Sequence, residues 1–196
     1  MKLTIELMKR LSLYLFLILF TLQTPSQADD IRDFQIEGMS IGDSLLDYLS
    51  YSKIKSLKTS YFPNSKKYIR YYDVQESNTY GGIDAYVLDN DKNFIVQSLT
   101  GYINYYNNIE DCYPKKKEIV KTIGSQLAVK GYSYVSNYDN DTSKSDVTDF
   151  DLTNGSIRIW CTDYSKEKED RKFGDFLSVN ASKKDFLSWV NNEAYK

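Results

Sequence analysis

The sequence predicts an α+β domain in which a largely antiparallel meander sheet carries helices packed on one face. Three observations lead to this class. Apolar residues alternate with period two in two groups, within 66–106 and within 132–180. A strongly amphipathic helical stretch at 108–131 separates these groups, and shorter helical patterns precede the first and follow the second. Runs of strands between single helices favour antiparallel pairing, so the expected order is helix, three strands, helix, three to four strands, helix.

The first 28 residues have the pattern of an export signal. Basic residues precede the apolar run 11–22, and Ser26 and Ala28 place small residues where a signal peptidase cuts. We therefore expect cleavage after Ala28, a periplasmic or secreted location, and one domain over 29–196 without a stable membrane span. The alternative is an uncleaved anchor helix, although a dozen apolar residues are few for crossing a bilayer.

Helical segments and a three-stranded meander are expected in the first half of the chain. Ser40 to Asp43 resembles a capping box, which predicts a helix over 41–50, and a weaker helical turn is expected over 52–57. Gly101 indicates a bulge in the third strand. The three strands are expected where the hydrophobic period becomes two, over 66–73, 83–89 and 93–106.

The central helix is expected over 108–131, with Asn108 as its cap and Gly131 as its stop. Pro114 predicts either a kink or a start nearer Tyr113. The lysines at 115–117 are interpreted as a solvated helix face. The residues expected to share the buried face are Ile109, Cys112, Ile119, Val120, Ile123 and Leu127.

The second half is expected to contain a strand at 132–138, a polar loop at 139–146, a hairpin and a final strand and helix. An Asn-Gly corner at 154–155 joins the hairpin strands. Ser182 opens a capping box before the final helix, in which Phe186 and Trp189 lie on the apolar face. The strands after the loop are expected over 147–152, 157–162 and 175–180.

Two cysteines in an exported chain indicate one disulfide, between Cys112 and Cys161. Such a bridge ties the central helix to the strand that carries Cys161. The alternative is a pair of buried free thiols.

The composition excludes several chemistries. Histidine is absent from the sequence, which removes Ser-His-Asp catalysis and the usual zinc sites, so we assign no catalytic residue and no metal site. There is no glycine-rich phosphate loop, and we expect no cofactor. With a formal net charge of −2 and interspersed signs, the chain has no pattern that favours binding to nucleic acid.

Tyrosines and acidic turns are the remaining candidate binding groups. The sequence holds 18 tyrosines, and Tyr71, Tyr102 and Tyr106 form a platform for a glycan or an envelope protein if they face water together. The alternative is that they are ordinary strand residues. Asp139 to Ser143 begins like a calcium loop, as does 89–93, but both lack the required glycine and the terminal glutamate, which favours a solvated turn.

Four segments resemble a small family of uncharacterised exported proteins of marine alphaproteobacteria. The segments are DFQIEGMSIGDSLLDY at 33–48, YFPNSKKY at 61–68, NNIEDCYPKKKEIV at 107–120 and GSIRIWCTDYS at 155–165. This resemblance implies export and a shared fold, and no catalytic residue. A helical start feeding a meander also resembles SmpA/OmlA-type assembly lipoproteins and β-lactamase-inhibitor-like domains. The chain lacks the lipidation cysteine of those lipoproteins, which argues against tethering to a membrane.

The functional hypothesis from the sequence is a non-catalytic binding or envelope-assembly module in the periplasm. The alternative is an envelope hydrolase that uses carboxylates, which requires a pair of buried acids in one cleft.

Overall fold

A computed structural model describes residues 30–106, 108–138, 143–165 and 174–196. The expected α+β class with a large antiparallel sheet is confirmed. Within the described residues the main sheet has eight strands in the order β3-β4-β5-β6-β10-β9-β8-β7. The strands are β3 (Thr59–Phe62), β4 (Ser65–Tyr71), β5 (Gly82–Leu88), β6 (Val96–Asn104), β7 (Tyr132–Tyr138), β8 (Ser143–Leu152), β9 (Gly155–Tyr164) and β10 (Phe176–Lys183). The helices are α2 (Tyr51–Ser56), α3 (Ile109–Leu127) and α5 (Lys184–Asn192).

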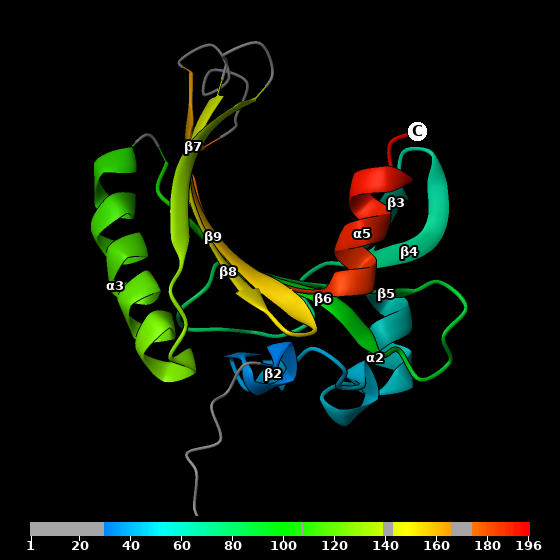
Figure 1. The fold of residues 1–196 in the computed structure, drawn as a ribbon. Helices are drawn as coiled ribbons and strands as arrows, with labels where there is room; N and C mark the ends of the chain where they lie inside the picture. The colour runs from blue at the N-terminus through cyan, green and yellow to red at the C-terminus, as the bar shows by residue number, and fades with distance from the viewer. Residues whose placement is uncertain (1–29, 107, 139–142, 166–173) are drawn as a thin grey trace, which may run out of the picture.

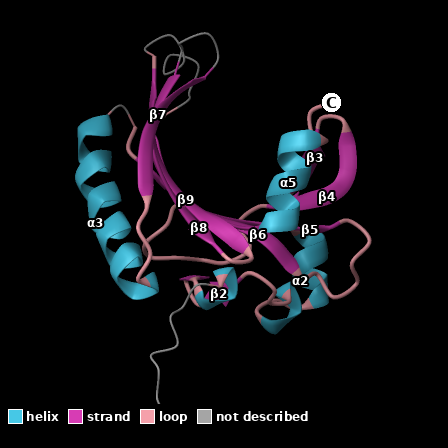
Figure 2. Ribbon diagram, in the orientation of Figure 1, coloured by secondary structure: helices cyan, strands magenta, loops and turns pink. Residues whose placement is uncertain are grey.

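The sheet is strongly curved, and the two ends of its strand order rise as two arms (Figure 1). Helix α3 lies outside the arm formed by β7 and β8, whereas α5 lies between the arms, close to β3 and β4 (Figure 2). We call the side that holds α5 the concave face and the opposite side the convex face. The two faces differ in chemistry because side chains alternate along each strand.

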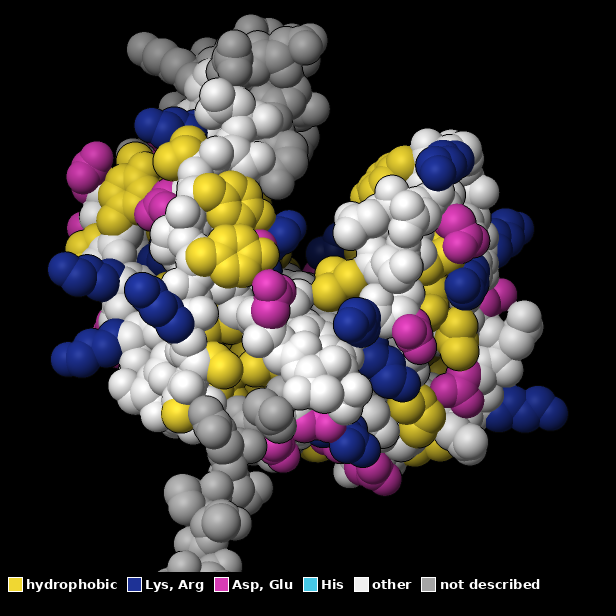
Figure 3. All heavy atoms as spheres, in the orientation of Figure 1, with side chains coloured by type: hydrophobic (Ala, Val, Ile, Leu, Met, Phe, Trp, Pro, Cys, Tyr) yellow, Lys and Arg dark blue, Asp and Glu magenta, His cyan; other side chains and the backbone are white. Residues whose placement is uncertain are grey.

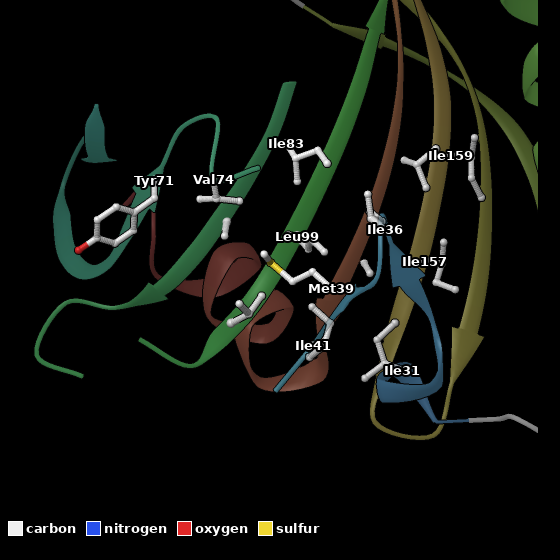
Figure 4. Packing of buried hydrophobic residues seen from close by; sticks show 14 of the residues in the cluster. Ile31, Ile36, Met39, Ile41, Tyr71, Val74, Ile83, Leu99, Ile157 and Ile159 are labelled. Carbon is white, nitrogen blue, oxygen red and sulfur yellow. The ribbon is translucent and has the colours of Figure 1, made fainter. Parts of the chain in front are cut away.

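The convex face carries the main hydrophobic core. The amino-terminal segment crosses it with the short strands β1 (Gln35–Ile36) and β2 (Met39–Ser40), preceded by the 3-10 helix η1 (Ile31–Asp33). Figure 4 shows how side chains of this segment point at the sheet. The labelled partners from the segment and the sheet are Ile31, Ile36, Met39, Ile41, Ile83, Leu99, Ile157 and Ile159, all buried.

Helix α3 covers the convex face over β9 and β10, and its expected buried stripe is confirmed. The helix begins at Ile109 and includes Pro114 in its first turns, so the start near Tyr113 is wrong. It ends at Ala128 in the left-handed conformation, before the expected stop at Gly131. The expectation that the lysines at 115–117 all lie on a solvated face is wrong for Lys116. It lies four residues after Cys112 on the buried stripe and is 5% exposed, and its Nζ lies 2.8 Å from Asp146 Oδ1.

The disulfide between Cys112 and Cys161 is confirmed. Its Cα atoms are 6.0 Å apart, and both cysteines are buried beneath α3. The bridge therefore joins α3 to the centre of β9, as the sequence indicated.

Helix α5 packs on the concave face, so the helices do not all share one face. Phe186 and Trp189 form a second buried cluster with Tyr68 of β4, against which Phe62 and Tyr86 pack. Tyr68 precedes Ile69 of the main core, and neighbouring residues in a strand point to opposite faces. Sequence periodicity showed which side of α5 is apolar, but it carries no information on which face of the sheet that side meets.

The expected helix over 41–50 is wrong. The structure has only the 3-10 helix η2 (Leu45–Asp47), because the backbone before it pairs with the start of β6. Gly42 N donates to Val96 O at 2.9 Å and Leu45 N donates to Phe94 O at 3.1 Å. The Asp43 carboxylate accepts from Ser40 N at 2.8 Å, so the apparent capping box closes a turn.

Two smaller expectations also differ from the structure. Gly101 pairs in regular register with Ile83 and Val179, and the irregularity of β6 lies opposite Tyr86 and Val87 instead. Gly101 is required for space, since a Cβ there would lie 2.6 Å from the ring of Tyr80. Ser182 does not cap the final helix, because it belongs to β10 and α5 begins after Lys183 without a side-chain cap.

The expected signal segment 1–28 lies outside the described residues. Within the described part of the chain, no helix is both long and apolar enough to cross a membrane.

Candidate functional site

The candidate site is the open half of the concave face, over β8, β9 and β10. In β9, Ile157, Ile159 and Cys161 point into the convex core, so Arg158 and Trp160 point to the concave face. Helix α5 covers the other half through its aromatic cluster. The space-filling view shows a deep notch between the two arms of the molecule (Figure 3).

A cavity of about 410 Å³ opens on this half of the sheet. This volume falls within the range of small-molecule sites, roughly 300–1,000 Å³. Among the described residues, Arg158 is the one charged side chain in its lining. The lining residues are Ser143, Ser145, Val147, Arg158, Trp160, Thr162, Tyr164, Phe176 and Asn180.

Aromatic side chains provide the apolar part of the cavity. Trp160 is half-buried in the lining, and its indole N–H has no hydrogen-bond partner among the described residues. Tyr164 and Phe176 lie beside each other, with ring centroids 6.1 Å apart. An indole that is both wet and unpartnered offers a flat apolar face and one donor to a ligand.

Arg158 is held in place by an ion pair. Its Nε and one terminal nitrogen each lie 2.8 Å from an Asp149 carboxylate oxygen, and Asp149 is only 4% exposed. The Tyr134 hydroxyl donates to the same carboxylate at 3.1 Å. This bidentate geometry fixes the plane of the guanidinium and neutralises its charge, so the described part of the lining is close to neutral.

Hydroxyl and amide groups of β6 and β10 form the polar floor between the open half and α5. Asn180 Nδ2 donates to Ser98 Oγ at 3.0 Å and to Thr100 Oγ1 at 2.9 Å, while its Oδ1 accepts from Ser182 at 2.8 Å. Ser98 and Ser182 also bond to each other at 2.7 Å. Because these polar groups, of which Ser98 and Ser182 are fully buried, satisfy one another, the floor is rigid without a ligand.

A second ion pair lies at the covered end of the concave face. Asp84, 1% exposed, accepts from Arg70 and from the Asp73 backbone N–H at 3.0 Å. The Arg70 guanidinium also stacks over Tyr72, 4.4 Å from the ring centroid. Burial raises the pKa of the Tyr86 phenol on this face.

Among the nearly fully buried carboxylates of the described residues, the two that are bound to an arginine lie far apart along the sheet. In the described residues the nearly fully buried acids are Asp84, Asp149 and Asp175. The first two are each bound to an arginine, and Asp175 Oδ1 accepts from the Tyr164 backbone at 2.9 Å. Asp84 and Asp149 lie on strands four positions apart, about 19 Å along the sheet, whereas hydrolase pairs lie within roughly 10 Å.

The three tyrosines expected to form a platform are not brought together. Tyr71 is 5% exposed and lies in the convex core. Tyr102 lies on the concave face, with its hydroxyl 3.4 Å from Asp73 Oδ1. Tyr106 is 74% exposed in the segment after β6. Whether any of them contacts a ligand stays a prediction.

Sequence reasoning missed Trp160 and Arg158. The signal was present in GSIRIWC, because a strand at 157–162 with Ile157, Ile159 and Cys161 inward must turn the intervening residues outward. An outward tryptophan flanked by an outward arginine marks the open face of the strand.

Of the two acidic turns, the structure describes all of 89–93 but only Ser143 of the turn that begins at Asp139. In the described residues, no group of three or more potential ligands is close enough together to hold a metal ion. The turn at 89–93 is closed by Asp91, whose carboxylate accepts from Asn93 N and Ile95 N, both at 2.9 Å. Residues 139–142 of the other turn lie outside the described residues.

Comparison with family models, with curated proteins and with solved structures finds no match to this chain. The functional argument therefore rests on the geometry of the concave face.

Proposed function

We propose that the protein is an exported, non-catalytic binding module that takes a neutral glycan on the open half of its concave face. The observation that carries the proposal is Trp160, a half-buried indole in a cavity of about 410 Å³. Within the described residues, this indole has no hydrogen-bond partner and the cavity lining is close to neutral.

The chemistry of the lining matches that of a sugar. A pyranose ring presents C–H groups on its faces and hydroxyls around its edge, so it stacks on an aromatic ring while bonding to polar neighbours. Trp160, Tyr164 and Phe176 supply the aromatic surface. The paired Arg158 and the serine and threonine hydroxyls supply polar groups without net charge, which favours an uncharged ligand over an anionic one.

The disulfide supports an oxidising compartment, where cell-envelope glycans are present. The buried carboxylates of Asp84 and Asp149 are each paired with an arginine, which supports binding without hydrolysis.

The experiment is a fluorescence titration of the Trp189→Phe variant. The sequence contains two tryptophans, and Trp189 is 3% exposed on the buried side of α5, so this variant leaves Trp160 as the only indole reporter. The probes are cellotriose, maltotriose, laminaritriose and chitotriose, with trialanine and polygalacturonate fragments as peptide and anionic comparisons. We expect at least one neutral trisaccharide to give a saturable change in Trp160 emission.

The matched variants are Trp160→Ala and Trp189→Phe, measured by calorimetry with the same sugar. Trp160→Ala should weaken binding by about tenfold or more, whereas Trp189→Phe should stay within about threefold of the unmodified protein. Failure of all four sugars, or tighter binding of the peptide or the anionic fragment, would contradict the proposal.

A further inference from the structure

The two edges of the eight-stranded sheet are protected unequally. Strand β3 has four residues, shifts register between Tyr61 and Phe62, and is followed by Pro63. Lys66 lies over the ring of Tyr61, 5.9 Å from its centroid. Short length, irregular pairing, proline and lysine are the features that prevent an edge strand from pairing with another chain.

Strand β7 is longer than β3, and its pairing with β8 is regular. It has seven residues with the sequence YSYVSNY, without charge, proline or glycine, and pairs in continuous register with β8. Tyr132 is 51% exposed and Val135 is 57% exposed. Hydrophobic side chains gather on the front of the arm over which β7 runs (Figure 3). A long, uncharged, β-prone edge of this kind is suited to pairing with another strand.

The sequence of β7 is compatible with pairing to its own copy about Val135, because it has no charged residue on either side of that position. In an antiparallel pair of two β7 strands centred there, Val135 faces its own copy, Tyr134 faces Ser136 and Ser133 faces Asn137. This pairing apposes no charges, and it keeps the concave and convex faces of the two sheets aligned because the period of a strand is two.

We propose that β7 pairs with β7 of a second copy of this chain around a two-fold axis through Val135. The two eight-stranded sheets then form one sixteen-stranded sheet whose outer edges are the protected β3 strands. Because both outer edges are protected, the assembly closes as a dimer and does not grow into a fibre. The proposal does not depend on the ligand of the concave face.

The first test is sedimentation velocity of the oxidised protein from roughly 1 µM to roughly 500 µM. We expect a monomer–dimer equilibrium. Val135→Lys places two ammonium groups opposite each other on the axis and should weaken dimerisation at least about tenfold. Val135→Thr keeps a neutral β-branched residue, and Thr59→Lys adds the same charge at the β3 edge; both should stay within about threefold of the unmodified protein.

The second test fixes the register. Residues directly opposite in an antiparallel pair have Cα atoms about 4.5–5.5 Å apart, within disulfide range, so Val135→Cys should cross-link two chains under mild oxidation. Asn137→Cys is the control, since it faces Ser133 and lies about 14 Å along the strands from its own copy. A protein that stays monomeric throughout overturns the proposal. So does a dimer that tolerates Val135→Lys, or one that cross-links equally through Asn137→Cys.

Discussion

The disulfide is the feature whose contribution to stability can be worked out most directly from the structure. Cys112 and Cys161 are 49 residues apart, and both are buried. Restricting a loop of this length in the unfolded chain stabilises the folded state by about 4 kcal/mol in the chain-entropy treatment. Replacing both residues by alanine should therefore remove about 4 kcal/mol, a large part of the stability of a typical domain.

The assay is equilibrium unfolding in urea followed by far-UV circular dichroism. With a urea dependence of about 2 kcal/mol per molar, the Cys112→Ala/Cys161→Ala protein should unfold at a midpoint roughly 2 M lower. Its urea dependence should also rise, because an unfolded chain without the cross-link exposes more surface. The matched control is the unmodified protein in excess phosphine reductant, which should behave like the double variant. A loss below about 1 kcal/mol would refute the reasoning, since it would mean that the bridge does not restrict the unfolded chain.

Three further changes test other parts of the fold by the same urea assay. Asp84→Asn leaves the partly exposed Arg70 without its charged partner and should cost about 2 kcal/mol. Gly155→Ala places a Cβ against the backbone carbonyl of Ser182 in the neighbouring strand, which cannot move aside, and should cost about 1–3 kcal/mol. Burial, reinforced by a hydrogen bond to a carboxylate, raises the pKa of Tyr48 from 10.0 to about 12, so the stability that this group contributes below pH 10 is lost between about pH 10 and 12. Tyr48→Phe should flatten the pH dependence of stability in that interval.

The parts of the fold that depend on one segment alone were predictable from the sequence. The buried stripe of α3 and the β8–β9 hairpin follow from spacing and from an Asn-Gly corner, both of which are local properties. The cysteine pair was predictable because two cysteines allow one connectivity.

The parts that depend on a distant partner were not predictable. The 41–50 segment has helical spacing, but backbone bonds to the start of β6 hold it extended until η2. Tyr71 and Tyr102 both occupy strand positions, and only the register across β4, β5 and β6 shows that they lie on opposite faces. The candidate site was missed for the same reason. Trp160 can be identified as part of an open surface only once α5 is known to pack over a different part of the sheet.

The size of α5 explains why the concave face stays open. A helix of nine residues is about 13.5 Å long, whereas eight strands span about 34 Å, so α5 cannot cover the sheet in any orientation. The strands that α5 leaves uncovered carry hydrogen-bonded polar pairs where the convex face has leucines and isoleucines. One such pair is Ser145 and Thr162, whose hydroxyl oxygens are 2.8 Å apart. A surface built in this way is suited to contact with water or with a polar ligand. If these strands were normally covered by a helix that is missing, apolar side chains would be exposed there instead. Trp160, together with Tyr164 and Phe176, adds aromatic surface to this otherwise polar half of the sheet. That aromatic surface is the feature on which the proposed binding of a glycan rests.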